Sequence, residues 1–133
     1  MKRISILTTE AEATLRGSAS VARLLDSLMD DPLGAHHLYE AARRAGKSRA
    51  QLDGLTRRFV GVTWHEFVLL HRLSLVAPIW CDPTLKRLVL ARKAGCNTVR
   101  AYRLSIERAR ALSQCKPQAV GIRFDLFRFP SCP

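Results

Sequence analysis

No apolar run in this 133-residue sequence is long enough to cross a membrane as a helix, which takes roughly 18 or more residues. The longest candidate, residues 67–80, is interrupted by His71, Arg72 and Pro78. The N-terminal apolar stretch, residues 4–7, is much shorter than the core of a secretory signal peptide. The sequence therefore predicts a cytoplasmic protein without a membrane partner.

Closely spaced cysteines are also missing. Cys81, Cys96, Cys115 and Cys132 follow one another at intervals of 15, 19 and 17 residues, and none forms the short pair typical of a zinc site. We expect reduced thiols, as in most cytosolic proteins. The four histidines are scattered, and none has the spacing of a nucleophile with its base. The sequence predicts neither a metal, nor a cofactor, nor enzyme activity.

Acidic residues are scarce. Eleven Asp and Glu stand against 22 Lys and Arg, which gives a formal net charge of +11. This balance favours a polyanionic partner, and nucleic acid, a membrane surface or an acidic protein would each satisfy it. The excess lies in two windows, because residues 41–60 carry +5 and residues 85–110 carry +7, whereas residues 1–35 carry −1. A polyanion would therefore meet two separate basic segments.

The two basic windows contain a repeat. The sequence Ala-Arg-Arg-Ala-Gly, ending at Gly46, recurs 49 residues later as Ala-Arg-Lys-Ala-Gly, ending at Gly95. Each copy ends a short helical run, where a glycine can take the left-handed conformation that terminates a helix. A polar residue, Ser48 or Asn97, follows and is suited to cap the next helix. The repeat predicts two units of helix, tight turn and helix.

Apolar spacing supports these helices and a linker between them. The stripes at spacings of three and four are Leu52, Leu55 and Phe59 in the first unit, and Val99, Tyr102 and Ile106 in the second. Between the units, Thr63 and Glu66 have the spacing of a capping box. We predict a linker helix there that Pro78 kinks or ends early, with Trp64 and Trp80 as core anchors.

These elements predict an all-α, homeodomain-like fold of two helix-turn-helix subdomains joined by a long linker helix. A chain of this length is too short for a sensor domain in addition. We expect a first helix at residues 20–29, and extended terminal segments at residues 2–7 and 122–127 that pair with each other. The expected divisions are an N-terminal extension (1–19), the first subdomain (20–62), the linker helix (63–80), the second subdomain (81–112) and a C-terminal tail (113–133).

From about residue 26 to 108 the chain resembles the AraC/XylS-type DNA-binding domain. The resemblance is carried by residues 40–52, Glu-Ala-Ala-Arg-Arg-Ala-Gly-Lys-Ser-Arg-Ala-Gln-Leu, and by residues 63–67, Thr-Trp-His-Glu-Phe. In the second unit the matching positions are Leu85, Leu88, Leu90, Ala91, Ala94, Gly95, Tyr102 and Ile106. The resemblance implies a bacterial, nucleoid-associated transcription regulator that presents two recognition helices to successive major grooves of double-stranded DNA.

The resemblance places base-contacting positions at Ala50, Asp53 and Gly54 in the first unit, and at Val99, Arg100 and Arg103 in the second. Either arginine of the second unit has the donors to address guanine. We expect Lys47, Arg57, Arg58, Lys86, Arg92 and Lys93 to neutralise phosphates. The full predicted DNA contact set is Lys47, Ser48, Arg49, Ala50, Gln51, Asp53, Arg57, Arg58, Asn97, Thr98, Val99, Arg100 and Arg103.

Some positions depart from the family pattern. Ala50 and Gly54 bring no polar group to a base, and Asp53 repels phosphate. Cys96 stands where the family usually has an aromatic residue. These departures favour an alternative hypothesis, a protein-interaction module that acts as an antagonist or co-regulator of a transcription factor or of RNA polymerase.

Overall fold

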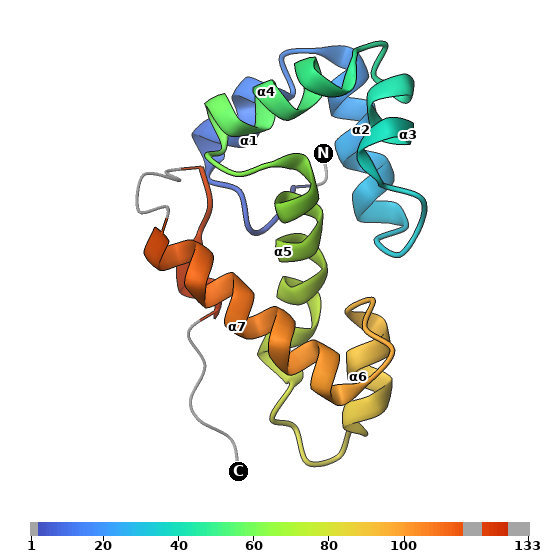
Figure 1. Ribbon diagram of the computed structural model, residues 1–133, viewed down its shortest axis with the longest axis vertical. Coiled ribbons are helices and arrows are strands. Elements are labelled where there is room, and N and C mark those ends of the chain that lie inside the picture. The colour runs from blue at the N-terminus through green and yellow to red at the C-terminus, as the bar shows by residue number, and fades with distance from the viewer. Residues whose placement is uncertain (1–2, 116–120, 128–133) are drawn as a thin grey trace.

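The computed structural model describes residues 3–115 and 121–127 (Figure 1). This part of the chain contains seven α-helices and two 3-10 turns and no strand, so the prediction of an all-α fold is confirmed. The helices are α1 (Thr9–Leu15), α2 (Ala19–Asp30), α3 (Leu38–Arg44), α4 (Arg49–Phe59), α5 (Trp64–Val76), α6 (Arg87–Lys93) and α7 (Val99–Cys115). The 3-10 turns are η1 (Ala77–Ile79) and η2 (Phe124–Phe127). None of the described helices is both long and apolar enough to span a membrane.

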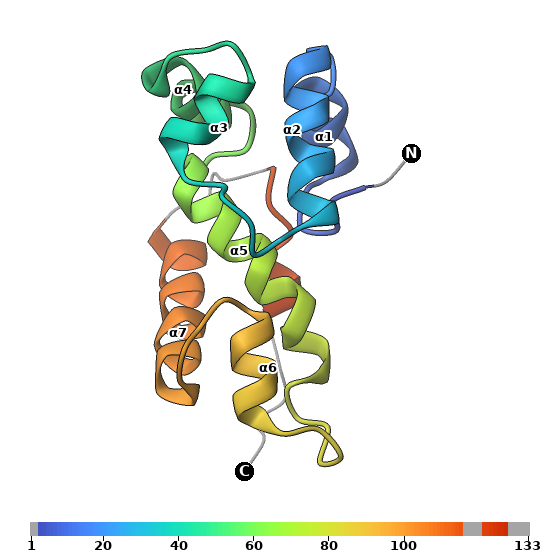
Figure 2. The same ribbon diagram turned by 90° about the vertical axis from the view of Figure 1, so that its right-hand side faces the viewer.

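Helix α5 connects two helix pairs. The first pair, α3 and α4, lies at one end of α5, and the second pair, α6 and α7, lies at the other (Figures 1 and 2). Helices α1 and α2 pack beside the first pair, where α1 contacts α4 and α2 contacts α3. The second pair contacts α5 through both of its helices.

The start of α4 and the start of α5 are both capping boxes, as the sequence predicts. At α4 the Ser48 hydroxyl accepts the Gln51 N–H at 3.1 Å, and the Gln51 side chain accepts the Ser48 N–H at 2.9 Å. Thr63 and Glu66 make the same reciprocal pair at α5, at 3.1 and 2.9 Å. The helix then ends at Val76, because η1 and its proline replace the last turn of the predicted linker.

Glycine ends the first helix of each pair, again as predicted. Gly46 and Gly95 have φ angles of +65° and +83°, a region that side chains bearing a Cβ rarely occupy. The turn after Gly95 is one residue longer than the turn after Gly46. The Thr98 hydroxyl accepts the Ala101 N–H at 3.0 Å, so Thr98, and not Asn97, caps α7. Ser48 and Thr98 are therefore equivalent positions of the two pairs.

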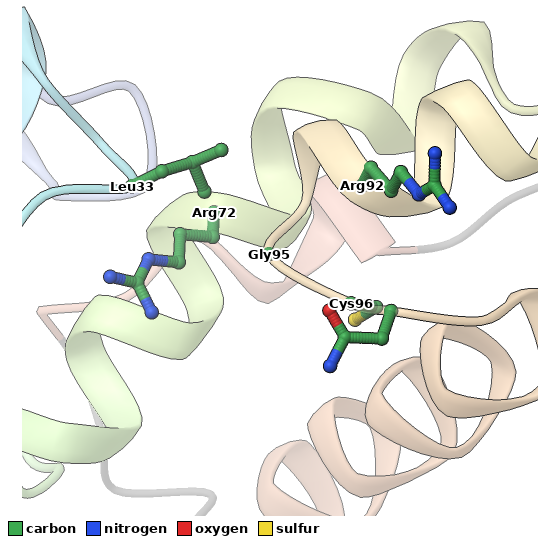
Figure 3. A pocket seen from close by; sticks show the side chains of 6 residues that line it. Leu33, Arg72, Arg92, Gly95 and Cys96 are labelled. Carbon is green, nitrogen blue, oxygen red and sulfur yellow. The ribbon is translucent and has the colours of Figure 1, made fainter.

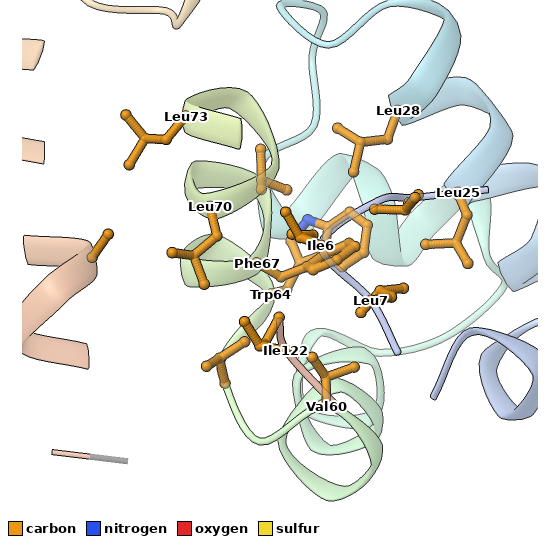
Figure 4. Close-up of a cluster of buried hydrophobic side chains, with 14 of the residues drawn as sticks. Ile6, Leu7, Leu25, Leu28, Val60, Trp64, Phe67, Leu70, Leu73 and Ile122 are labelled. Atoms are coloured by element: carbon orange, nitrogen blue, oxygen red, sulfur yellow. The ribbon is translucent and has the colours of Figure 1, made fainter. Parts of the chain in front are cut away.

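The core is continuous from the N-terminal segment through α2 to α5 (Figure 4). Trp64 and Phe67 of α5 are almost fully buried and their ring centroids lie 5.4 Å apart. The predicted stripes are confirmed, since Leu52, Tyr102 and Ile106 are buried and Leu55, Phe59 and Val99 pack half-buried against the core. Trp80, the other expected anchor, stacks on Tyr102 with centroids 4.0 Å apart.

Within residues 3–115 and 121–127, the terminal segments meet at one antiparallel bridge, between Leu7 and Ile122. The Arg123 N–H donates to the Ile6 carbonyl at 2.8 Å, and the Thr8 N–H donates to the Gly121 carbonyl at 3.0 Å. The predicted pairing is therefore real but short. The expectation of an extended segment up to residue 127 is wrong, because residues 124–127 form η2.

Helix α1 has no counterpart among the sequence predictions. Its N-terminus is capped by Thr8, whose hydroxyl accepts the Ala11 N–H at 3.3 Å. The buried Glu12 carboxylate accepts the Ile4 N–H at 2.5 Å and the Arg3 Nε–H at 3.0 Å. This carboxylate holds the preceding segment against α1.

The prediction of four reduced cysteines is also wrong, because Cys81 is disulfide-bonded. Cys96 and Cys115 are free thiols, the first half-buried and the second exposed.

Candidate nucleic-acid interface

The first turn of α4 is open to solvent. Ser48, Arg49, Ala50 and Gln51 are exposed, because Leu52 and Thr56 form the buried side of the helix. Arg49 makes no ion pair within the described residues, so its guanidinium is available to an external partner. The hydroxyl oxygen of Ser48 and the side-chain carbonyl oxygen of Gln51 already accept hydrogen bonds in the capping box.

Asp53 faces the protein and not the solvent. Its Oδ1 accepts the backbone N–H of Trp64 at 2.9 Å, and its Oδ2 lies 3.2 Å from Nη2 of Arg57. Trp64 in turn donates its indole N–H to the carbonyl of His36 at 2.7 Å. Asp53 therefore holds the corner between α4 and α5, and this contact was not foreseen from the sequence.

Part of the positive charge of the first pair is neutralised internally. Glu40 lies 2.7 Å from Nη2 of Arg43 and 3.3 Å from Nε of Arg44. The hydrogen bond from Arg43 is the main reason that the pKa of Glu40 is lowered, and the same bond raises the pKa of Arg43. Arg58 lies over the ring of Phe59, 5.1 Å from its centroid. Lys47 is half-buried, and like Arg49 it has no acidic partner in the described chain.

The first turn of α7 carries its charge without such partners. Arg100 and Arg103 are exposed and make no ion pair or hydrogen bond through their side chains in the part of the chain that the structure describes. Asn97 and Thr98 are exposed beside them, and Val99 is half-buried. With Thr98 equivalent to Ser48, Arg100 and Arg103 occupy the places that Ala50 and Asp53 hold on α4. The second pair is thus the less neutralised of the two basic surfaces.

The predicted contact residues form two groups and not one. Residues 47–58 lie on the first pair and residues 97–103 lie on the second, at opposite ends of α5. Figure 2 shows α4 and α7 on the same side of the molecule, the left of that view. One elongated ligand on that side would reach both helices.

Arg72 of α5 links the loop between α2 and α3 to the turn between α6 and α7. Its Nε donates to the carbonyl of Pro32 at 2.7 Å and its Nη2 donates to the carbonyl of Gly34 at 3.3 Å, which fixes the loop between α2 and α3. The turn at Gly95 packs on the same side chain, since a Cβ there would lie 3.4 Å from Cδ of Arg72 and from Cδ2 of Leu33. Burial lowers the pKa of Arg72. No sequence signal identifies Arg72 for this role, because its partners are backbone carbonyls about 40 residues away.

An open pocket of about 290 Å³ lies at this contact (Figure 3) and is lined by Leu33, Arg72, Arg92, Gly95, Cys96 and Asn97. The Arg72 guanidinium points away from Arg92, so the two cations do not converge on one ligand position. The neighbouring His71 is buried, and neither of its ring nitrogens has a hydrogen-bond partner among the residues that the structure describes. Burial, with smaller effects of His36 and Arg72, lowers its pKa to about 4, so His71 is neutral at pH 7.

Over residues 3–115 and 121–127, no three His, Cys, Asp or Glu side chains are placed to hold a metal ion. Comparison with known protein families, with curated proteins and with solved structures gives no match. The function must therefore be argued from the chain's own geometry.

Proposed function

We propose that the protein is a transcriptional regulator that binds double-stranded DNA, with α4 and α7 entering successive major grooves on one side of the duplex. The observation that carries the proposal is the exposure of two basic helix starts at the two ends of one linker helix. Helix starts of this kind read base edges in helix-turn-helix proteins, and grooves on one side of a duplex recur after roughly 34 Å. The glycine-containing turn within each pair agrees with that architecture.

The two helices would contribute unequally. Helix α4 offers Ala50 and Gly54, which have no hydrogen-bonding side chain, and an Asp53 that is bonded to Trp64 and Arg57. Helix α7 offers Arg100 and Arg103, whose guanidinium groups can bond O6 and N7 of guanine in a bidentate way. We assign base discrimination mainly to α7, and we assign to α4 mainly the contacts with phosphates.

The test is a binding assay on a library of random duplexes with wild type, Arg100→Ala and Arg58→Ala. Arg100→Ala should relax the base preference at one half of the selected site, by about 1–3 kcal/mol of discrimination. Arg58→Ala should weaken binding to all duplex sequences by a similar factor. With roughly six phosphate contacts, the slope of log affinity against log salt should be about −5. An affinity that does not change with salt would refute DNA binding.

A second candidate is a protein-interaction module that acts on a transcription factor or on RNA polymerase. It is favoured by α4, where the side chains that would read bases are small or, at Asp53, committed to the fold. Affinity capture in the presence of nuclease separates the two functions. A partner that is lost with the DNA supports the regulator, and a partner that remains supports the interaction module.

A further inference from the structure

Helix α6 has an outward side that the rest of the described chain does not cover. Leu85, Leu88 and Val89 are 40%, 42% and 49% exposed, and Arg92 and Lys93 follow them as exposed residues. Leu88, Val89, Arg92 and Lys93 are spaced by three and four residues along α6, so they form one stripe of the helix, and Leu85 lies in the bend just before its N-cap. We call this stripe, together with Leu85, the outward face of α6. Helix α6 itself lies beside α7 at the end of the molecule opposite α3 and α4 (Figures 1 and 2).

The opposite side of α6 accounts for its packing. Leu90, Ala91 and Ala94 are buried, and Arg87 lies over the ring of Trp80, 5.8 Å from its centroid. The aliphatic residues of the outward face therefore do not take part in the packing of the core. The exposure of Leu85 and Leu88 is not evident from the sequence, because both residues match apolar positions of the family resemblance, just as the buried Leu90 does. Three large aliphatic side chains exposed next to one another are typical of a contact surface.

The first pair indicates what the outward face lacks. On α3, Glu40 neutralises Arg43 and Arg44. The repeat places Val89 at the position of Glu40, and Arg92 and Lys93 at the positions of the two arginines. Arg92 and Lys93 have no acidic partner within the described residues, and α6 itself contains no acidic residue. The acidic group that the first pair supplies from its own helix is missing from the second.

We propose that the outward face of α6 binds a protein segment that folds as an amphipathic helix, with aliphatic residues followed by acidic ones. The aliphatic residues pack on Leu85, Leu88 and Val89, and the acidic residues pair with Arg92 and Lys93. Such grooves and faces commonly recognise a helix through residues spaced by three and four. Phosphate groups would satisfy the two cations but would leave the aliphatic residues in water, so the face fits a protein better than DNA. The proposal does not depend on the DNA-binding function.

The test uses the full chain labelled with ¹⁵N and a synthetic helical peptide with a leucine stripe that continues into glutamates. Two control peptides replace the glutamates by lysine, or the leucines by serine. The test variant is Leu88→Ser combined with Val89→Ser. The matched control is Leu104→Ser, which removes a side chain that is 56% exposed on α7 and lies off the outward face. Circular dichroism shows whether each variant keeps its helix content.

We expect the first peptide to shift the amide signals of residues 85–93, and both control peptides to bind at least about tenfold more weakly. The double variant should lose about tenfold or more in affinity, and Leu104→Ser should change it less than about twofold. Four results would overturn the proposal. These are equal binding by the double variant, equal binding of the lysine peptide, shifts confined to α4 and α7, and self-association of the free chain that the double variant abolishes. A fifth result would also overturn it, namely weaker binding of a DNA duplex by the double variant, since Leu88 and Val89 would then belong to the DNA interface.

Discussion

The carboxylate of Asp53 accepts the first backbone N–H of α5, that of Trp64, across the corner between two helices. A helix leaves its first N–H groups without internal partners, and Thr63 satisfies only the N–H of Glu66. Asp53 is thus a second cap for α5, supplied by a residue eleven positions earlier. It fixes the direction in which α5 leaves the first pair.

Asp53→Ala should lower the free energy of unfolding by about 1 kcal/mol, as the loss of a cap usually does. Urea unfolding measures it. Arg57→Ala is the control, because it removes only the exposed ion pair and should cost no more than about 0.5 kcal/mol. Equal losses in the two variants would mean that the ion pair, and not the cap, is what Asp53 contributes.

Glu40→Gln should strengthen DNA binding if the proposed function is right. The substitution removes the charge that pairs with Arg43 and Arg44, so both arginines become available to phosphates. The log–log salt slope should steepen by about one to two. Glu107→Gln provides the comparison, since it removes one exposed acidic charge that has no ion pair within the described chain. A Glu40→Gln effect no larger than that of Glu107→Gln would show that net charge alone matters.

Gly95→Ala should destabilise the protein more than Gly46→Ala does. Both glycines have positive φ, and a Cβ in that region costs about 1–2 kcal/mol. A Cβ at Gly95 would also lie 3.4 Å from side-chain carbons of Arg72 and Leu33, at the near limit of van der Waals contact, whereas a Cβ at Gly46 would meet no atom of the described residues within 4 Å. Thermal unfolding of both variants measures the difference. Equal melting temperatures would indicate that the Gly95 turn does not rest tightly on Arg72.

Stability should fall between about pH 7 and pH 5 because of His71. Its pKa is about 4 in the folded protein, below the ordinary value of 6.5, so the unfolded chain binds the proton first. The stability that depends on neutral His71 is fully present above pH 6.5, the pKa of His71 in the unfolded chain. As the pH falls below that value the free energy of unfolding decreases, by about 2 kcal/mol at pH 5. Urea unfolding at several pH values measures it. His71→Leu should flatten this dependence, and the exposed His65→Gln should leave it unchanged.

Features set by neighbouring residues were predictable from the sequence. The capping boxes at Ser48 and Thr63 and the turn at Gly46 depend on contacts within a few positions, and each is present as predicted. The cap of α7 shows the limit of this reasoning. Asn97 and Thr98 both have side chains suited to a cap, and the Thr98 hydroxyl is the one that accepts a helix N–H, that of Ala101.

Features set by distant residues were not predictable. Asp53 looked like a solvated or base-reading residue, because nothing near it indicates that the N–H of Trp64 lies within its reach. Leu88 matches an apolar position of the family resemblance, and its exposure follows only from where α5 and α7 lie against α6. Helix α1 is missing from the predictions because the apolar residues that bury it are few and its ties run to Ile4 and Gly121.

The contact between the two terminal segments determines when the protein can finish folding. Ile122 is buried beside Leu7, and Gly121 lies so close to the end of α4 that a Cβ there would be 2.7 Å from Cα of Val60. The packing of the first pair is therefore completed by residues that are synthesised well after it. Helices of the first pair can form during synthesis, but their final packing must wait until residues 121 and 122 have been made.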